Sequence, residues 1–307
     1  MSTPPRPTGP TPPLDLRTNP LTGETVLVVP GRAGRPGALA RTSRVSDAAT
    51  CPFCEGNEVL TPPEVAAYGR AAGADRDSPG WLVRVVPNKY PAFPGHEVVV
   101  HGPDHLLSLT EVSSSVRETV VTAWRERRDA HLDAGAAYAL VAINEGAAAG
   151  ASLDHTHSQV IPFAEVPPVL VRESAAFAAG CPLCREPEHV VDQRDGLVTF
   201  CPDWSRTPYE TWIAPARHAE RAPLDAGLGT ALAGAVTRLR GLLGRDLAWN
   251  AYLHELPGGA PFHWHIELVP RLSVAASVEL GAGIWVNVVD PARAAADLRA
   301  VVPDVTG

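Results

Sequence analysis

The sequence predicts an α+β protein in which two similar halves follow each other along the chain. Short apolar runs of alternating character recur, two longer amphipathic runs separate them, and the same order of elements occurs twice. We expect each half to be an antiparallel sheet covered by one helix. A chain of 307 residues that is 45% hydrophobic is long enough to bury two cores of this size.

The strands are predicted from runs rich in β-branched and aromatic residues. In the first half these runs lie at 24–29, 82–86, 96–101, 137–143 and 156–161. In the second half they lie at 197–201, 209–214, 249–254 and 263–268. The stretches 31–50 and 68–80 are rich in Pro and Gly and are expected to be surface loops. We place the two domains at 14–165 and 166–307, after a polar, Pro-rich start at 1–13 that we expect to be disordered.

Each half contains one helix, predicted from apolar residues three or four positions apart. The first helix is expected at about 111–133, and its apolar face carries Val116, Val120, Val121 and Trp124. The second is expected at about 225–243, and its apolar face carries Leu228, Leu232, Val236, Leu239 and Leu243.

The composition narrows the class of protein. The formal net charge of −8 argues against a nucleic-acid-binding protein, which would present a basic surface. No apolar run approaches the roughly 20 residues that span a bilayer, and the start of the chain lacks the hydrophobic core of a signal peptide. We therefore expect a cytoplasmic protein with no membrane or nucleic-acid partner.

The repeat is clearest when the halves are compared segment by segment. The first half reads CPFC (51–54), VVPNKYPAF (85–93), HEVVVHGPDHLLSL (96–109) and AYALVAINEGAAAGASLDHTHSQVIP (137–162). The second reads CPLC (181–184), TFCPDWSRTP (199–208), YETWIAPARHAERAPL (209–224) and WNAYLHELPGGAPFHWHIELVP (249–270).

Two CxxC pairs, each followed by two spaced histidines, predict two metal sites. A single CxxC would also be compatible with a redox pair, but two Cys with two His satisfy tetrahedral zinc in both halves. The expected ligands are Cys51, Cys54, His105 and His155 at one site and Cys181, Cys184, His218 and His263 at the other. We expect Zn²⁺, with iron as an alternative at one site, and each ion would attach a loop to the sheet.

The stretch LDHTHSQVIP (153–162) places His155, His157 and Gln159 on one face of a predicted strand. An isolated pair of this kind could equally be a hydrogen-bonded surface strand. If His155 binds a metal, however, His157 is left as an oriented, neutral imidazole, which is what a nucleophile requires. In the second half His265 is followed by Glu267 instead of Gln, and we expect His265 and Trp264 to be core residues.

These motifs resemble the galactose-1-phosphate uridylyltransferase branch of the histidine triad superfamily, including its ADP-glucose phosphorylase-like members with two CxxC zinc sites. The resemblance runs from about Leu14 to Val302. Its segments are LRTNPLTGETVLVVPGRAGRP, CPFCEGNE, VPNKYPAF, GPDH, NEGAAAGASLDHTHSQ and HWHIELVPRLSVAASVELGAG. The segment from Asn144 to Gln159 is the most specific of them.

The resemblance implies two histidine-triad-like domains and a reaction through a covalent nucleotidyl-histidine. It assigns His157 as the nucleophile and Gln159 as the amide that binds a phosphoryl oxygen. The implied substrate-binding residues are Arg32, Arg35, Asn88, Asn144, Gly150, Ser152 and Glu279. Lys89 stands where related enzymes often carry an acidic ribose-binding residue, so the preferred base stays open. Relatives commonly form homodimers, and we expect the same of this chain.

The leading functional expectation is a UDP-glucose:hexose-1-phosphate uridylyltransferase, with a nucleotide sugar and a sugar 1-phosphate as substrates. The main alternative is a nucleotide-sugar phosphorylase that uses inorganic phosphate on ADP-glucose. A hydrolase is disfavoured because single-domain relatives usually carry a histidine at the position of Gln159. A binding module without catalysis is disfavoured by the spare imidazole of His157.

Overall fold

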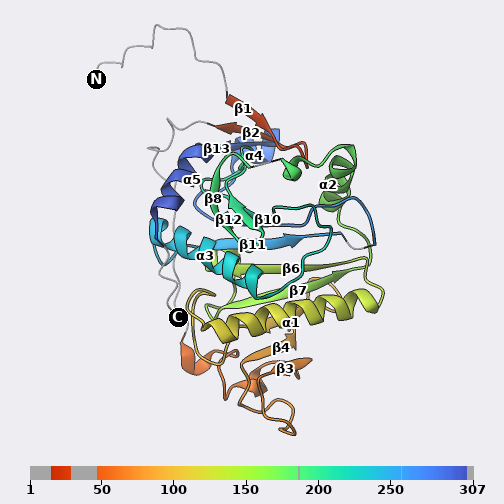
Figure 1. The fold of residues 1–307 in the computed structure, drawn as a ribbon. Coiled ribbons are helices and arrows are strands. Elements are labelled where there is room, and N and C mark those ends of the chain that lie inside the picture. The colour runs from red at the N-terminus through yellow and green to blue at the C-terminus, as the bar shows by residue number, and fades with distance from the viewer. Residues whose placement is uncertain (1–14, 29–46, 186, 257, 303–307) are drawn as a thin grey trace, which may run out of the picture.

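The computed structural model describes residues 15–28, 47–185, 187–256 and 258–302. Its centre is a ten-stranded sheet in the order β3-β4-β5-β7-β6-β11-β12-β10-β9-β8 (Figure 1). Neighbouring strands are antiparallel throughout this sheet. The structure is therefore of mixed α+β character with an antiparallel sheet, as predicted.

Each half of the chain supplies five of these strands. The first half contributes β3 (Ala66–Tyr68), β4 (Val83–Pro87), β5 (Glu97–Val100), β6 (Tyr138–Glu145) and β7 (His157–Phe163). The second half contributes β8 (Val190–Arg194), β9 (Leu197–Phe200), β10 (Thr211–Pro215), β11 (Trp249–His254) and β12 (His265–Pro270).

The two halves meet at β6 and β11, where Asn144 lies opposite Asn250 in the ladder. Counted outward from this junction, the strand order is β6, β7, β5, β4, β3 in the first half and β11, β12, β10, β9, β8 in the second. In both directions the second strand carries the second histidine of His-x-His, and the last three strands come earlier in that half of the chain. The sequence predicted a sheet for each half. The structure instead joins the two into one sheet, because the β6 edge of one half is hydrogen-bonded to the β11 edge of the other.

Two helices cover one face of this sheet (Figure 1). They are α1 (Ser114–Asp133), which packs along β6 and β7, and α3 (Ala226–Leu243), which packs on β9 and β10. Both begin at a side-chain cap: Ser113 accepts from the Val116 amide and Asp225 from the Leu228 amide. Among the described residues no helix is both long and apolar enough to cross a membrane.

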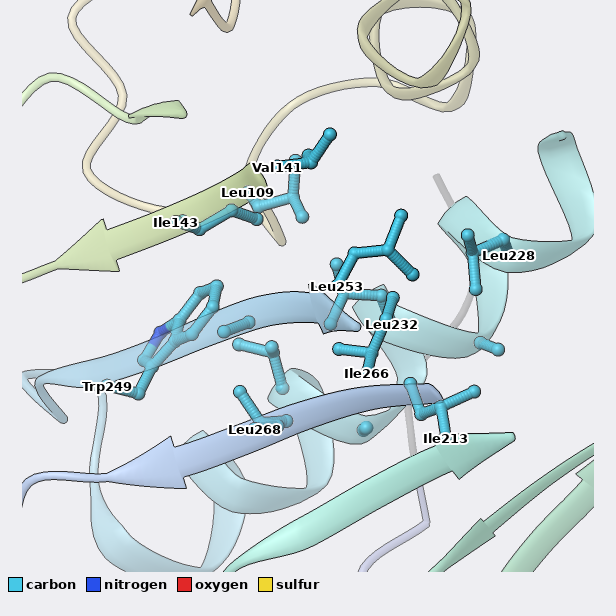
Figure 2. Close-up of a cluster of buried hydrophobic side chains, with 14 of the residues drawn as sticks. Leu109, Val141, Ile143, Ile213, Leu228, Leu232, Trp249, Leu253, Ile266 and Leu268 are labelled. Atoms are coloured by element: carbon cyan, nitrogen blue, oxygen red, sulfur yellow. The ribbon is translucent and has the colours of Figure 1, made fainter. Parts of the chain in front are cut away.

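The main core lies between these helices and the sheet, and Figure 2 shows its centre. Leu253 and Ile266 face Leu228 and Leu232 of α3 there, and all four side chains are buried. Each such side chain stabilises the fold by about 1.5–3 kcal/mol through burial. Successive residues of a strand point to opposite faces of the sheet. Because aliphatic residues fill the helix-covered face, the polar side chains of β6, β7, β11 and β12 can lie on the other face.

The remaining elements include several that the sequence did not predict. Strands β1 (Asp15–Thr18), β2 (Thr25–Val28) and β13 (Ile284–Asn287) form a separate small sheet, in which β13 runs parallel to β2. The further helices are α2 (Pro168–Ala179), α4 (Ser277–Ala282) and α5 (Pro291–Ala300). Through Phe177, which packs against Phe262 and the ring of His265, α2 covers the polar face of the second half.

Candidate active site and metal clusters

The first predicted metal site is assembled as expected. The Nδ1 atom of His155 lies 3.7 Å from Cys51 Sγ and 3.6 Å from Cys54 Sγ, and His105 Nδ1 lies 3.4 Å from Cys54 Sγ. The four ligand atoms all fall within 4.8 Å of one another. The other ring nitrogen of His155, Nε2, donates to the Gly102 carbonyl at 3.0 Å, which leaves Nδ1 deprotonated and aimed at the thiols.

The second site repeats this arrangement. Cys181 Sγ and Cys184 Sγ lie 3.2 and 3.7 Å from His263 Nδ1, and His218 Nδ1 lies 3.3 Å from Cys184 Sγ. His263 Nε2 donates to the Pro215 carbonyl at 3.0 Å, in parallel with His155. The second cluster is the more accessible of the two, because Cys184 is exposed whereas Cys51 is buried.

Both clusters fit a tetrahedral metal ion. Ligand distances of about 2.3 Å for sulfur and about 2.0–2.1 Å for nitrogen place neighbouring ligands roughly 3.5 Å apart, which is the spacing observed here. Without a cation, burial and the neighbouring Cys51 raise the pKa of Cys54 to about 12. Burial and the Cys184 side chain likewise raise the pKa of Cys181 to about 11. Both thiols would ionise only with a metal beside them.

His157 lies just outside the first cluster and has a defined tautomer. Its Nδ1 donates to the carbonyl oxygen of His155 at 2.8 Å, so the proton resides on Nδ1 and Nε2 keeps a lone pair. Burial lowers the pKa of His157, while the bond to His155 acts in the opposite direction. The result is a neutral imidazole near pH 7, held against the edge of Phe53 at a ring-centre distance of 5.2 Å.

The equivalent histidine of the second half, His265, has the same tautomer but a closed environment. Its Nδ1 donates to the His263 carbonyl at 3.0 Å. The ring is fully buried and is stacked on Trp212 at 4.6 Å, with Phe262 parallel to it at 6.2 Å. A substrate phosphorus has no room to approach such a ring. The expectation that His265 and Trp264 are core residues is confirmed, since Trp264 is also buried.

The sheet register brings three predicted site residues to one face. Gln159 pairs with Ala142, and Ser158 pairs with Ile143. Because alternate residues share a face, Asn144 of β6 and His157 and Gln159 of β7 all lie on the face opposite α1. Asn144 is held from the second half, because Asn250 Nδ2 donates to Asn144 Oδ1 at 2.7 Å.

Gly150 and Ser152 lie in the small-residue loop between β6 and β7. Gly146 and Gly150 bound a short 3₁₀ turn, Ala147–Ala149, and have φ angles of 83° and 86°. At Gly146 a Cβ would also come within 2.8 Å of the Ala248 Cβ, so both backbone conformation and packing require glycine there. Asn250 Nδ2 donates to the Ala149 carbonyl at 2.8 Å and so ties this turn to the second half.

Asn88 follows β4 and reaches the same region. It does so through His96, whose Nε2 lies 3.2 Å from Asn88 Nδ2 and 2.7 Å from Gln159 Oε1. The adjacent Lys89 is exposed. Asn88 and Gln159 are therefore brought together around one buried imidazole.

The structure does not join the remaining predicted residues to this group. Arg32 and Arg35 lie outside the described residues. Glu279 lies in α4 beside the small sheet, and its carboxylate accepts from the Ala276 amide at 2.8 Å. Among the described residues no hydrogen bond connects Glu279 with His157 or Gln159, so its role stays a prediction.

A third polar group occupies the covered face of the second half. Its members Glu173, His254, His265 and Glu267 are all buried and have ligand atoms within 4.8 Å of one another. Burial opposes the charged form of His254, but the Glu173 carboxylate, whose oxygens lie 3.0 Å away, raises the His254 pKa. The guanidinium of Arg206 contacts Glu267 and supplies a positive charge within the same group.

Several of these residues were missed in the sequence. His96 begins the predicted strand 96–101, and only its approach to Gln159 distinguishes it from other strand histidines. Asn250 lies in the predicted strand 249–254, and only the antiparallel register of β6 and β11 places it opposite Asn144. Glu173 lies in a helix that was not predicted.

The fold and the site together define a class of protein. In this class a strand of an antiparallel sheet begins at the second histidine of a His-x-His pair. The first histidine belongs to a Cys/Cys/His/His cluster, and the second lies outside it. The family model described as galactose-1-phosphate uridyl transferase, N-terminal domain, matches residues 92–167, which contain this strand.

Known proteins match over most of the chain. The ADP-glucose phosphorylase of Arabidopsis thaliana is 28% identical over 331 aligned residues, covering 94% of this chain and 93% of that protein. The galactose-1-phosphate uridylyltransferase of Thermotoga maritima is 27% identical, covering 93% of this chain and 98% of its own length. The crystal structure of the Arabidopsis phosphorylase with bound ADP-glucose superposes with a TM-score of 0.80 at 26% identity, over 94% of this chain and all of that one.

The chain is therefore similar over most of its length to a galactose-1-phosphate uridylyltransferase and to an ADP-glucose phosphorylase, and its residues 92–167 match the uridyl transferase family model. This confirms the resemblance read from the sequence motifs.

Proposed function

We propose that this protein is a nucleotidyltransferase that cleaves a nucleoside diphosphate sugar and carries the nucleotidyl group on His157. The observation that carries the proposal is the tautomer of His157, whose Nδ1 is held by the His155 carbonyl so that Nε2 has a free lone pair. The similarity to a uridylyltransferase and to a phosphorylase supports the substrate class.

In the first half-reaction, Nε2 of His157 attacks the α-phosphorus of the nucleotide sugar. An N–P bond forms, and the bond from the α-phosphorus to the bridging oxygen breaks, so the sugar 1-phosphate leaves. The carbonyl of His155 holds the Nδ1 proton as the ring acquires positive charge. In the second half-reaction a phosphate oxygen of the acceptor attacks the same phosphorus, and the N–P bond breaks.

The surrounding residues supply hydrogen bonds and shape. Gln159 is proposed to donate to a nonbridging phosphoryl oxygen, where a neutral, fixed amide can follow the charge that develops in the transition state. Gly150 and Ser152 offer a loop of little bulk to the phosphates, and Asn88 and Asn144 are proposed to contact the nucleotide. Arg32, Arg35 and Glu279 are proposed to bind the diphosphate and the sugar, as the resemblance implies.

The metal ions are proposed to be structural. Bound Zn²⁺ would hold the 51–54 loop and His155 in place, and through His155 it would fix the carbonyl that orients His157. The second ion, zinc or iron, would hold the corresponding loop of the second half. We further propose that the halves, 14–165 and 166–307, are duplicated histidine-triad-like domains; the matching strand order counted outward from β6 and β11 supports this.

Two acceptors are compatible with this first half-reaction. A sugar 1-phosphate would make the protein a hexose-1-phosphate uridylyltransferase, as the Thermotoga relative is named. Inorganic phosphate would make it a phosphorylase, as the Arabidopsis relative is named. Two observations make phosphorylase activity as strong a candidate as uridylyltransferase activity. They are the superposition on the Arabidopsis phosphorylase and the exposed Lys89 at the expected ribose position. We also propose a cytoplasmic homodimer.

The proposal is tested by offering the two half-reactions separately. The protein is incubated with UDP-glucose or ADP-glucose labelled at the α-phosphate, first alone and then with phosphate or galactose 1-phosphate. Stable protein-bound label without acceptor, discharged by one of the two acceptors, is the expected result. Release of free nucleotide without any acceptor would instead indicate a hydrolase, and absence of labelling with both sugars would overturn the proposal.

A further inference from the structure

The imidazole of His96 lies between two side chains that the proposed function uses. His96 immediately precedes β5, and Val98 of β5 pairs with Gln159 of β7. His96 therefore shares a sheet face with Val98 and is a diagonal neighbour of Gln159. Its side chain is only 6% exposed, so its hydrogen-bonding partners are other protein groups.

The tautomer of His96 follows from a partner that can only donate. The backbone amide of Ala92 points to His96 Nδ1 at 3.4 Å, so Nδ1 is an acceptor. The ring proton is then on Nε2, which lies 2.7 Å from Gln159 Oε1 and donates to it. Burial lowers the pKa of His96, although the bond to Gln159 acts in the opposite direction, and this favours the neutral ring that the Ala92 contact requires.

This hydrogen bond decides which end of the Gln159 amide is available. An amide can rotate by 180° at little cost unless its neighbours distinguish oxygen from nitrogen. Because His96 occupies the Oε1 end, the NH₂ group is the end left for a ligand. The opposite orientation would direct the carbonyl oxygen at a phosphoryl oxygen, and two acceptors repel each other.

Asn88 is oriented against the same ring. The Tyr90 amide donates to Asn88 Oδ1 at 2.9 Å, so the Asn88 NH₂ group must face His96. That nitrogen lies 3.5 Å from Nδ1, which can accept from it, and 3.2 Å from the protonated Nε2, which cannot. One imidazole therefore packs against the amides of both Asn88 and Gln159.

We propose that His96 is a positioning residue for nucleotidyl transfer: it fixes the Gln159 amide so that its NH₂ group faces the α-phosphate. This inference rests on the proposed function of His157 and Gln159. The merely structural alternative is that His96 fills space beside β5 and contributes only to stability.

The decisive experiment is a double-mutant cycle of His96→Leu and Gln159→Ala, read as the single-turnover rate of protein labelling by α-phosphate-labelled ADP-glucose or UDP-glucose. Loss of a transition-state donor costs roughly 10²–10³ in rate, and loss of the group that orients it is expected to cost less, about tenfold. If His96 acts through Gln159, the double variant will be no slower than Gln159→Ala alone. Multiplied effects of the two substitutions would overturn the inference, as would labelling of His96→Leu at the wild-type rate.

Two further variants separate positioning from stability. His96→Gln can place an amide donor near the position of Nε2 and should recover part of the rate. Val99→Ala removes a buried side chain from the opposite, helix-covered face of β5, so it should lower the melting temperature without slowing labelling. If Val99→Ala slows labelling as much as His96→Leu at equal loss of stability, the effect of His96 is structural. Failure of the wild-type protein to label at all would refute the proposed function instead.

Discussion

The Nδ1 atom of His157 donates to the backbone carbonyl of His155, 2.8 Å away, while the ring of His155 itself turns its Nδ1 toward Cys51 and Cys54. His155 and His157, which are separated by one residue, therefore have different roles. The first belongs to the metal cluster, and its main chain sets the tautomer of the second. Because the acceptor is a backbone carbonyl, the bond does not depend on the rotamer of the His155 side chain.

The first prediction concerns His157. Replacement by glycine should abolish covalent labelling by an α-phosphate-labelled nucleotide sugar, because no other nitrogen at this position can attack the phosphorus and form the N–P bond. Zinc content should change little, since the His155 carbonyl and the thiols are untouched, whereas the melting temperature should fall because a buried ring is lost from a strand. Peptide mapping of the labelled wild-type protein should place the label at His157 and not at the buried His265. Loss of zinc in the variant would show that His157 is a ligand and that the assignment is wrong.

The second prediction concerns the metal clusters. Elemental analysis should find two ions per chain, and a chelator should remove the second-site ion first because Cys184 is exposed while Cys51 is buried. Cys51→Ser should lose the first ion together with labelling activity. The matched control is Cys201→Ala, which removes a buried cysteine that belongs to neither cluster and should retain both ions. Equal retention of metal by Cys51→Ser would contradict the ligand assignment.

The third prediction concerns Asn250. Its amide donates both to Asn144 Oδ1 and to the Ala149 carbonyl, and each such bond contributes about 0.5–1.5 kcal/mol. Asn250→Ala should therefore lower the free energy of unfolding by about 1–3 kcal/mol and raise the KM for the nucleotide sugar. Asn250→Asp should be worse than Asn250→Ala, because an oxygen would then face the Ala149 carbonyl. If Asn250→Asp were as stable as wild type, the bridge to this loop would have no energetic role.

The fourth prediction concerns Glu145, which is buried and accepts from the Trp249 indole and the Leu109 amide. Burial raises its pKa from 4.5 to about 7. The native state therefore binds a proton that the unfolded chain has released, so wild-type stability falls as pH rises from about 5 to about 8. At 1.36 kcal/mol for each pKa unit the effect is at most about 3 kcal/mol.

The measurement for Glu145 is chemical unfolding of wild type and Glu145→Gln at both pH values. The amide of glutamine does not titrate in this range. It offers one acceptor oxygen to the two donors, so the substitution also lowers the free energy of unfolding by an amount that does not depend on pH. The stability of the variant relative to wild type should therefore rise between pH 5 and pH 8. A constant difference would mean that Glu145 is ionised throughout.

Much of the site could be predicted from local sequence. The eight residues of the two Cys/Cys/His/His clusters could be grouped because cysteines three positions apart share a turn and two spaced histidines follow each pair. His155, His157 and Gln159 were grouped because strand residues two apart share a face. The helices α1 and α3 carry continuous apolar faces and were predicted within a few residues of their bounds. The helices α2 and α5 and the strands β8 and β13 are short or lack a clear period, so they were missed.

The sequence by itself determined the chemistry available: two Cys/Cys/His/His sets, and beside each of them one imidazole that lies outside the set. The tertiary structure decided the surroundings of each imidazole. Pairing of β6 with β11 brings Asn250 to Asn144, pairing of β5 with β7 brings His96 to Gln159, and packing of α2 beside Phe262 encloses His265. These contacts join residues that are distant in the chain. They form because sheet edges and apolar helix faces must be covered, and the spacing of residues along the chain does not predict which segments cover them.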